Sequence, residues 1–153
     1  MELKIKVVSP KIGREFPLPQ YKTAGAAAMD LCACTEEDVT LAPGQRMGIP
    51  TGIAIALPSP DYAALVFVRS GMGFKHGIGL SNGVGVIDSD YYFSDNEGHI
   101  FAKITNDSKS QKIVHVEAGN GFMQAIFIPY GITYSDDATG VRNGGMGSTD
   151  SKA

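Results

Sequence analysis

Two closely spaced aspartates, Asp88 and Asp90, follow a glycine-rich stretch that begins at Asn82. The surrounding segment, residues 85–91, reads Gly-Val-Ile-Asp-Ser-Asp-Tyr. If this segment is a strand, side chains two residues apart point to the same face, and the two carboxylates can share one site. A carboxylate in a binding pocket can act as a general base that activates water. Asp-Ser-Asp is also a common turn sequence, so the segment alone fits a catalytic site and a solvated turn equally well.

Other kinds of catalysis have no candidate residues in the sequence. The chain lacks a Gly-x-Ser-x-Gly elbow, a Walker phosphate loop and a Cys/His dyad for a covalent intermediate. The three histidines, His76, His99 and His115, do not have the spacing of metal ligands and are expected to be structural or surface residues. General-base activation of water is therefore the chemistry that the sequence favours.

A candidate anion site lies at Arg69-Ser70-Gly71, where a predicted strand ends. The planar guanidinium of Arg69 suits a phosphate or a carboxylate, and Lys75 adds a second positive charge nearby. The alternative is that Ser70 caps a short helix and Arg69 forms a surface ion pair. Asp30 is a carboxylate among small apolar residues, so its burial requires a cation, a water shell or an arginine as partner.

The elements that must position these residues are predicted to be short β-strands. Apolar and polar residues alternate, or β-branched residues cluster, in segments separated by Pro, Gly, Asp and Asn turns. The predicted strands are residues 3–8, 45–50, 51–57, 62–68, 99–105, 113–116 and 122–128. Asn82-Gly83 is typical of a β-hairpin turn, and the helical candidate is residues 72–76, after Ser70. This pattern predicts an all-β sandwich, jelly roll or barrel.

The composition indicates one globular domain. The chain has 153 residues, of which 43% are hydrophobic, and its net charge of -3 argues against binding a nucleic-acid polymer. Cys32 and Cys34 are poorly placed to form a disulfide and are expected to be small hydrophobic residues in a reducing compartment. No apolar run is long enough to span a membrane, and a cytoplasmic protein without a membrane partner is predicted.

The C-terminal segment, residues 140–153, differs from residues 1–139 in having almost nothing to bury. Its many glycines are typical of a disordered tail. The alternative is a flexible arm of the same domain, whose backbone N–H groups close on a phosphate when the ligand binds.

Taken in order, these segments resemble the five motifs of the trimeric dUTP diphosphatase (dUTPase) family. The resembling segments are residues 27–31 (Ala-Ala-Met-Asp-Leu), 69–72 (Arg-Ser-Gly-Met), 85–91, 121–124 (Gly-Phe-Met-Gln) and 142–149 (Arg-Asn-Gly-Gly-Met-Gly-Ser-Thr). The resemblance covers nearly the whole chain, and the order and spacing of the motifs are more specific than any one of them. It implies a distorted jelly roll of short antiparallel strands, assembled as a homotrimer with active sites shared between chains.

The resemblance also implies a role for each matching residue. Asp88 would be the general base for water that attacks the α-phosphorus of dUTP, giving dUMP and pyrophosphate. The substrate would be bound by Asn82, Gly85 and Val86 at uracil, by Tyr91 at deoxyribose, and by Arg69, Ser70, Gly71 and Gln124 at the phosphates. Asp30 would face the waters of a Mg²⁺ ion carried by the triphosphate. Arg142, Met146, Gly147, Ser148 and Thr149 would act from the arm, with Arg142, Ser148 and Thr149 on the γ-phosphate. The enzyme would limit uracil in DNA and supply dUMP for thymidylate synthesis.

The sequence departs from the family pattern at several places. Residues 92–96 look like a short insertion in place of the usual Arg-Gly-Glu, which alters what packs beneath Asp88 and Tyr91. Met146 stands where a phenylalanine usually stacks on the uracil, and its thioether can still cover a base. Phe122 stands where arginine is common, and Ala28 where glycine is usual.

Three other functions fit the same fold. A dCTP deaminase, or a bifunctional deaminase–diphosphatase, requires a glutamate beside the base, and Glu97 is the nearest in sequence to the 82–88 hairpin. A non-catalytic nucleotide-binding regulatory domain would explain the altered arm, although Asp88 argues against it. A structural jelly-roll subunit would bind no nucleotide at all.

Overall fold

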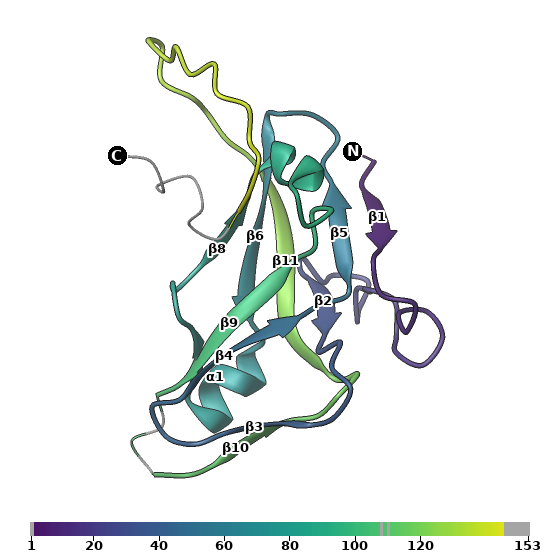
Figure 1. Ribbon diagram of the computed structural model, residues 1–153, viewed down its shortest axis with the longest axis vertical. Coiled ribbons are helices and arrows are strands. Elements are labelled where there is room, and N and C mark those ends of the chain that lie inside the picture. The colour runs from purple at the N-terminus through teal and green to yellow at the C-terminus, as the bar shows by residue number, and fades with distance from the viewer. Residues whose placement is uncertain (1, 108, 110, 146–153) are drawn as a thin grey trace.

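The computed structural model describes residues 2–107, 109 and 111–145. Short strands dominate this part of the chain, with one short helix and one 3-10 helix (Figure 1). In order, the elements are β1 (Lys4–Val7), β2 (Met29–Cys32), β3 (Val39–Leu41), β4 (Arg46–Pro50), β5 (Ile53–Ala56), β6 (Tyr62–Val68), α1 (Ser70–His76), β7 (Ile78–Leu80), β8 (Gly85–Ile87), η1 (Ser89–Phe93), β9 (Phe101–Asn106), β10 (Val114–Val116) and β11 (Gly121–Pro129). The all-β prediction is confirmed. No helix among the described residues is long and apolar enough to cross a membrane.

The strands form small antiparallel sheets that pack face to face. The largest has the order β2-β11-β6-β8, and a second has the order β4-β9-β7. Two further ladders join β1 to β5 and β3 to β10. In the described part of the chain these sheets do not close into a barrel. The hydrophobic core lies between them, and Leu31, Ile49, Ile104 and Phe122 are almost fully buried there. Phe122 therefore contributes to packing, where the family pattern has a charged residue.

The predicted strands are found close to their expected bounds, and β6 matches residues 62–68 in full. Strands β2, β3 and β7 were not predicted, and β8 was considered only as part of a strand over residues 85–91; each of the four has three or four residues. So short a segment shows too little alternation to be recognised. The helix begins at Ser70, two residues before the predicted start, and its N-cap is Arg69, without a side-chain cap bond. The interpretation of Ser70 as the N-cap is therefore wrong.

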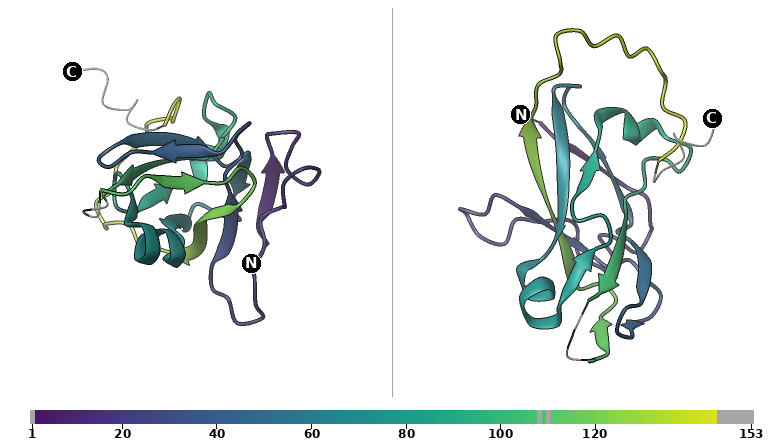
Figure 2. Two further views of the ribbon diagram at one scale, coloured as in Figure 1. Left: turned by 90° about the horizontal axis from the view of Figure 1, so that it is seen from below. Right: turned by 90° about the vertical axis from the view of Figure 1, so that its left-hand side faces the viewer.

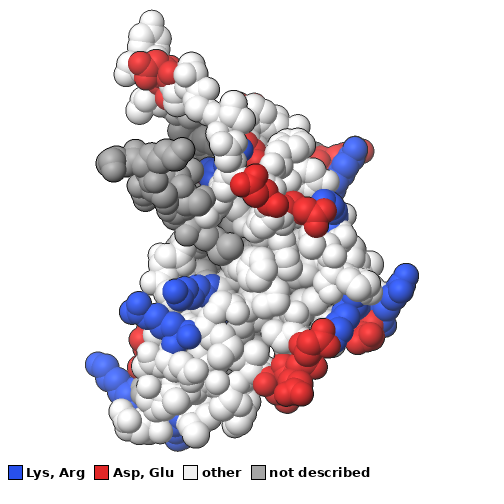
Figure 3. All heavy atoms as spheres, viewed as in Figure 1, with Lys and Arg blue, Asp and Glu red and all other residues white. Residues whose placement is uncertain are grey.

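The chain after β11 leaves the sheets and arches back toward η1 (Figure 2). This C-terminal arm contacts the rest of the chain again at Asn143, whose carbonyl oxygen accepts a hydrogen bond from the backbone N–H of Asp95 (3.0 Å). On the face shown in Figure 3, lysines and arginines lie in separate small groups and form no continuous basic surface. This face, on a chain with a net charge of -3, offers a polyanionic polymer no extended basic surface.

Candidate active site

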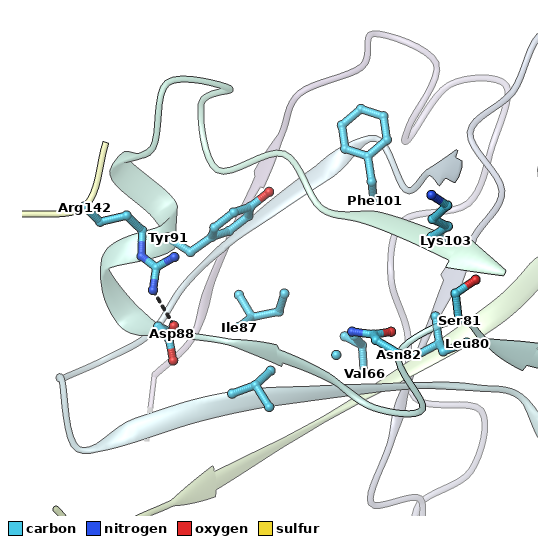
Figure 4. Close-up of a pocket in the computed structure, with 12 residues that line it drawn as sticks. Val66, Leu80, Ser81, Asn82, Ile87, Asp88, Tyr91, Phe101, Lys103 and Arg142 are labelled. Atoms are coloured by element: carbon cyan, nitrogen blue, oxygen red, sulfur yellow. Dashed lines mark hydrogen bonds and ion pairs between the residues drawn. The ribbon is translucent and has the colours of Figure 1, made fainter. Parts of the chain in front are cut away.

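The β7–β8 turn, strand β8, strand β9 and the helix η1 surround a cavity of about 600 Å³ (Figure 4). Six of the residues singled out from the sequence line it: Asn82, Gly85, Val86, Asp88, Tyr91 and Arg142. The remaining lining residues are Val66, Leu80, Ser81, Ile87, Phe101 and Lys103. Its volume lies within the range of small-molecule sites, which is about 300–1,000 Å³. The structure thus brings Asn82, Asp88 and Tyr91 to one cavity, whereas Asp90 does not line it.

One wall of this cavity is the turn between β7 and β8. Strand β7 pairs with β9 and strand β8 pairs with β6, so the two strands do not pair with each other and the predicted Asn82-Gly83 β-hairpin is wrong. The turn is tight, with Gly83 at a φ of 78°, and a Cβ atom at Gly85 would overlap the Val66 side chain of β6. Among the described residues β8 is the edge strand of its sheet, so its backbone is open on the side away from β6.

Asp88 and Asp90 converge, but not in the way expected from the sequence. The strand ends at Ile87, and Asp88 is the N-cap of η1, so the extension of the strand through Asp90 is wrong. The two carboxylates are instead joined by Arg142 of the C-terminal arm. Its Nη2 lies 2.5 Å from Oδ2 of Asp88, and its Nε lies 2.7 Å from Oδ1 of Asp90. One guanidinium thus forms an ion pair with each carboxylate and holds Asp88 at the edge of the cavity (Figure 4).

Tyr91 forms a buried wall of the same cavity. Its side chain is only 6% exposed, and its hydroxyl donates to the carbonyl oxygen of His99 (2.8 Å). Gly145 packs so closely on the ring that a Cβ atom there would overlap it. The arm therefore covers Tyr91 from one side, while residues 94–99 support it from the other.

A second group of site residues gathers at a different place, between β2, β11 and the end of β6. Arg69 forms an ion pair with Asp30 (Nε–Oδ1, 3.3 Å) and donates from Nη1 to the carbonyl oxygen of Gly121 (3.1 Å). Gln124 pairs with Asp30 across the sheet. Asp30, Arg69 and Gly121 line a separate cavity of about 300 Å³. The partner of Asp30 is thus Arg69. The second carboxylate oxygen, Oδ2 of Asp30, has no hydrogen-bond partner among the described residues.

The strand register separates the two groups. Ile87 pairs with Ala64, so Asp88 lies beside Ala63 of β6. Arg69 follows Ala63 by six residues, which at about 3.3 Å per residue corresponds to roughly 20 Å along the strand. The Arg69 side chain also points to β2 and β11, on the side of β6 opposite to β8. One chain therefore does not bring Asp88 and Arg69 into the same cavity.

The sequence and structure are similar to those of several enzymes. The dUTPase family profile matches residues 14–150. The chain is 40% identical to the deoxyuridine 5'-triphosphate nucleotidohydrolase of Enterobacter sp. (strain 638), over 99% of this chain and 98% of that protein. It is also 40% identical to the protein of that name from Escherichia coli O9:H4 (strain HS), over 95% of each. The dUTPase of Streptococcus mutans has a similar structure, with a TM-score of 0.70 and 32% identity, covering 84% of this chain and 97% of that one. The chain belongs to the dUTPase family.

The small sheets form the jelly roll of the dUTPase family, and the activity class is hydrolysis of dUTP.

The remaining site residues named from the sequence lie at α1 and in the arm. Ser70 is exposed on α1 and Gly71 is half-buried beside it, near Arg69. Met146, Gly147, Ser148 and Thr149 lie outside the described residues.

Sequence reasoning missed several residues that the structure places at the cavity. Phe101 and Lys103 line it because they alternate on β9 with Ala102 and Ile104, which face the core. The alternation was visible in the sequence, but nothing in it indicated which face of β9 is turned to the β7–β8 turn and the cavity. Asn96 was grouped with the insertion and given no role. Its hydrogen bond to Tyr91 depends on a turn of the chain that the sequence did not predict.

His99 links this region to the opposite sheet. Its Nε2 accepts a hydrogen bond from the backbone N–H of Gly52 (3.0 Å), which requires an unprotonated Nε2. Burial lowers the pKa of His99 below its ordinary value of 6.5, and the nearby charge of Glu97 opposes that shift. The folded protein therefore favours the neutral imidazole.

The lowered pKa of His99 predicts a loss of stability in acid. The unfolded chain binds this proton at higher pH than the folded chain, so the contribution of His99 is complete above about pH 6.5 and is lost as the pH falls through the folded pKa. We expect the Tm of the wild type to fall more between about pH 7.5 and about pH 5 than the Tm of His99→Gln, whose amide oxygen accepts the same bond without titrating. Thermal unfolding followed by circular dichroism measures both. His115→Gln, on the exposed surface, is the control, and equal pH slopes for the wild type and His99→Gln would contradict the expectation.

Proposed function

We propose that the cavity between the β7–β8 turn and η1 binds dUTP, and that Asp88 activates the water that attacks the α-phosphorus. The observation that carries this proposal is the position of Asp88 at the edge of a nucleotide-sized cavity, between the backbone of β8 and Tyr91. Asp88 would accept the proton of the attacking water while the bond from the α-phosphorus to the bridging oxygen breaks. The products are dUMP and pyrophosphate.

Binding of the nucleoside follows from the walls of the cavity. The backbone of Asn82, Gly85 and Val86 offers N–H and C=O groups to the edge of uracil, because Gly85 lies flat on β6. Tyr91 packs its buried ring against the deoxyribose and leaves a 2′-hydroxyl without a partner. Met146 and Gly147 of the arm would cover the base. In this assignment, the β7–β8 turn and β8 bind the base, η1 binds the sugar through Tyr91, and the arm closes the site.

Arg142 has two partners in the proposed cycle. Without substrate it pairs with Asp88 and Asp90 and thereby occupies the proposed base. The γ-phosphate of dUTP competes for the same guanidinium, since Arg binds phosphate as well as carboxylate. Arg142 would then move to the phosphate, with Ser148 and Thr149 beside it, and release Asp88 to act on water.

Arg69, Ser70, Gly71 and Gln124 are proposed to hold the phosphate chain, and Asp30 to face the waters of Mg²⁺. The described residues contain no group of three or more His, Cys, Asp or Glu that could cage a metal ion. This fits Mg²⁺, which keeps several waters and is commonly bound through substrate phosphates. The unpaired Oδ2 of Asp30 can accept a hydrogen bond from such a water. The dUTPase of phage phi11 of Staphylococcus aureus is described with a structural Mg(II) ion.

The separation of Asp88 from Arg69 supports a homotrimer with shared sites. The roughly 20 Å between them along β6 exceeds the length of a triphosphate chain, so the Arg69 that holds the phosphates must come from a second copy. Closed symmetric assembly is the common way in which identical chains build such composite sites. The free thiols of Cys32 and Cys34 fit a reducing compartment, and we place the trimer in the cytoplasm.

The lining of the cavity favours hydrolysis over deamination. A dCTP deaminase needs a glutamate at the base, and none of the described lining residues is a glutamate. Glu97 pairs with Lys6 instead (3.4 Å). Pyrophosphate should therefore be released from dUTP, and ammonia should not be released from dCTP.

Substitution of the proposed base should separate chemistry from binding. We expect Asp88→Asn to lower kcat for dUTP by at least about a thousandfold, because the amide cannot take the proton of the attacking water. Binding of a non-hydrolysable dUTP analogue, measured by calorimetry, should remain within a few-fold of the wild type. The matched control is Asp107→Asn, a surface aspartate after β9, which should retain full activity. Turnover of dUTP by Asp88→Asn at the normal rate would show that the base is another group.

Mixing inactive variants tests whether sites are shared. Asp88→Asn and Arg69→Ala should each be inactive as separate homotrimers. Chains of the two variants that are unfolded and refolded together should recover part of the activity, because some sites then combine Asp88 of one chain with Arg69 of another. The control is the double variant Asp88→Asn/Arg69→Ala refolded with Asp88→Asn, which supplies no Asp88 and should stay inactive. Absence of recovery in the first mixture would indicate that each site uses its own chain alone.

A further inference from the structure

We propose that Asn96 is a positioning residue for Tyr91 and thereby sets the discrimination of the site between deoxyribo- and ribonucleotides. Asn96 belongs to the 92–96 segment that departs from the family pattern after Tyr91. The inference rests on the proposed function, because it assumes that Tyr91 is the wall against which the sugar packs. It assigns to the segment a role that the motifs do not give.

The hydroxyl of Tyr91 is held by two hydrogen bonds from this segment and its end. Oη donates to the carbonyl oxygen of His99 (2.8 Å) and accepts from Nδ2 of Asn96 (3.0 Å). The same Nδ2 also donates to the carbonyl oxygen of His99 (3.0 Å). The Tyr91 hydroxyl, the Asn96 carboxamide and the His99 carbonyl are thus each hydrogen-bonded to the other two. The Tyr91 side chain is therefore held at its hydroxyl end.

Asn96 is in turn fixed by Ser94. Oγ of Ser94, which is only 4% exposed, lies 2.8 Å from Oδ1 of Asn96 and 2.6 Å from the carbonyl oxygen of Tyr91. Hydrogen bonds within residues 91–99 thus hold both the hydroxyl and the backbone carbonyl of Tyr91. The ring therefore has little freedom to tilt into or out of the cavity.

The backbone of the segment is folded tightly enough to maintain these contacts. Glu97 has a φ of 61° and Gly98 a φ of 70°, which reverses the chain toward Tyr91. A Cβ atom at Gly98 would lie 2.7 Å from Cα of Tyr92, so the turn packs against the backbone of the residue after Tyr91. The segment therefore folds back on Tyr91 and does not extend away from the site.

The position of the Tyr91 ring should affect binding of the sugar more than binding of the phosphates. A 2′-hydroxyl placed against a fixed ring loses its hydrogen bonds to water and gains no hydrogen bond to the protein, and this cost disfavours a ribonucleotide. A ring that can tilt lets water or the hydroxyl find a partner. Asp88 is held by Arg142 and not by Asn96, so loosening Tyr91 leaves the base in place. Loss of Asn96 should therefore change selectivity while the hydrolysis of dUTP continues.

A double-mutant cycle tests this role. Steady-state hydrolysis of dUTP and UTP is measured for the wild type, Asn96→Ala, Tyr91→Phe and the double variant. We expect Asn96→Ala to raise the ratio of kcat/KM for UTP over dUTP by about tenfold, the effect of roughly one net hydrogen bond, with kcat for dUTP within a few-fold of the wild type. In the Tyr91→Phe background the same substitution should change the ratio by less than about twofold, because the hydroxyl on which Asn96 acts is gone.

Two further variants keep the test decisive. Asn96→Asp retains the shape of the side chain but removes both N–H donations, and it should raise the ratio in the same direction even if Asn96→Ala folds poorly. Gln45→Ala removes an exposed carboxamide that accepts from the N–H of Ala42, far from the cavity, and should leave the ratio unchanged. A fall in Tm with an unchanged ratio would overturn the proposal in favour of a purely structural role, as would additive effects in the cycle. A wild type that does not hydrolyse dUTP would instead contradict the proposed function.

Discussion

Strand β6 is paired on both edges, with β11 on one side and β8 on the other, and this double pairing determines where the site residues lie. The β8 ladder ends at Ile87, so Asp88 leaves the sheet at a fixed point. At the opposite end of β6, Arg69 turns toward β2 and β11. A shift of register by one residue would move every side chain of a strand to the other face. The positions of Asp88 and Arg69 therefore depend on one strand, and under the proposed function their separation along it is the reason to expect two copies of the chain at one composite site.

Arg142 adds an electrostatic constraint to this frame. Asp88 and Asp90 are close enough to repel each other, and the guanidinium of Arg142 offsets that repulsion through one ion pair with each. Because Arg142 belongs to the C-terminal arm, the charge state of the site is linked to the position of the arm. In the proposed mechanism a triphosphate replaces the carboxylates as the partner of Arg142. Asp88 is then freed only when a substrate with a γ-phosphate is present, which couples arm closure to the availability of the base.

The sequence allowed the fold class, the longer strands and the 82–91 cavity to be predicted, and it failed where distant parts of the chain meet. Strand β6 is seven residues long and lies between clear turn residues, whereas β7 and β8 have three residues each and show no period. The convergence of Asp88 and Asp90 was predicted on a strand, but it arises from a 3-10 helix and from Arg142, which is more than fifty residues away in the sequence. Asn96 had no recognisable signal, because its role depends on a tight turn formed by its own insertion.

The central claim is that water, activated beside the nucleoside cavity, attacks the α-phosphorus of dUTP. Hydrolysis of dUTP in isotopically labelled water, followed by mass spectrometry of both products, tests it most directly. We predict that the heavy oxygen appears in dUMP and not in pyrophosphate, because the bond that breaks lies between the α-phosphorus and the bridging oxygen. Heavy oxygen in pyrophosphate would mean attack at the β-phosphorus and would contradict the assignment of Asp88 as the base at the α-phosphorus.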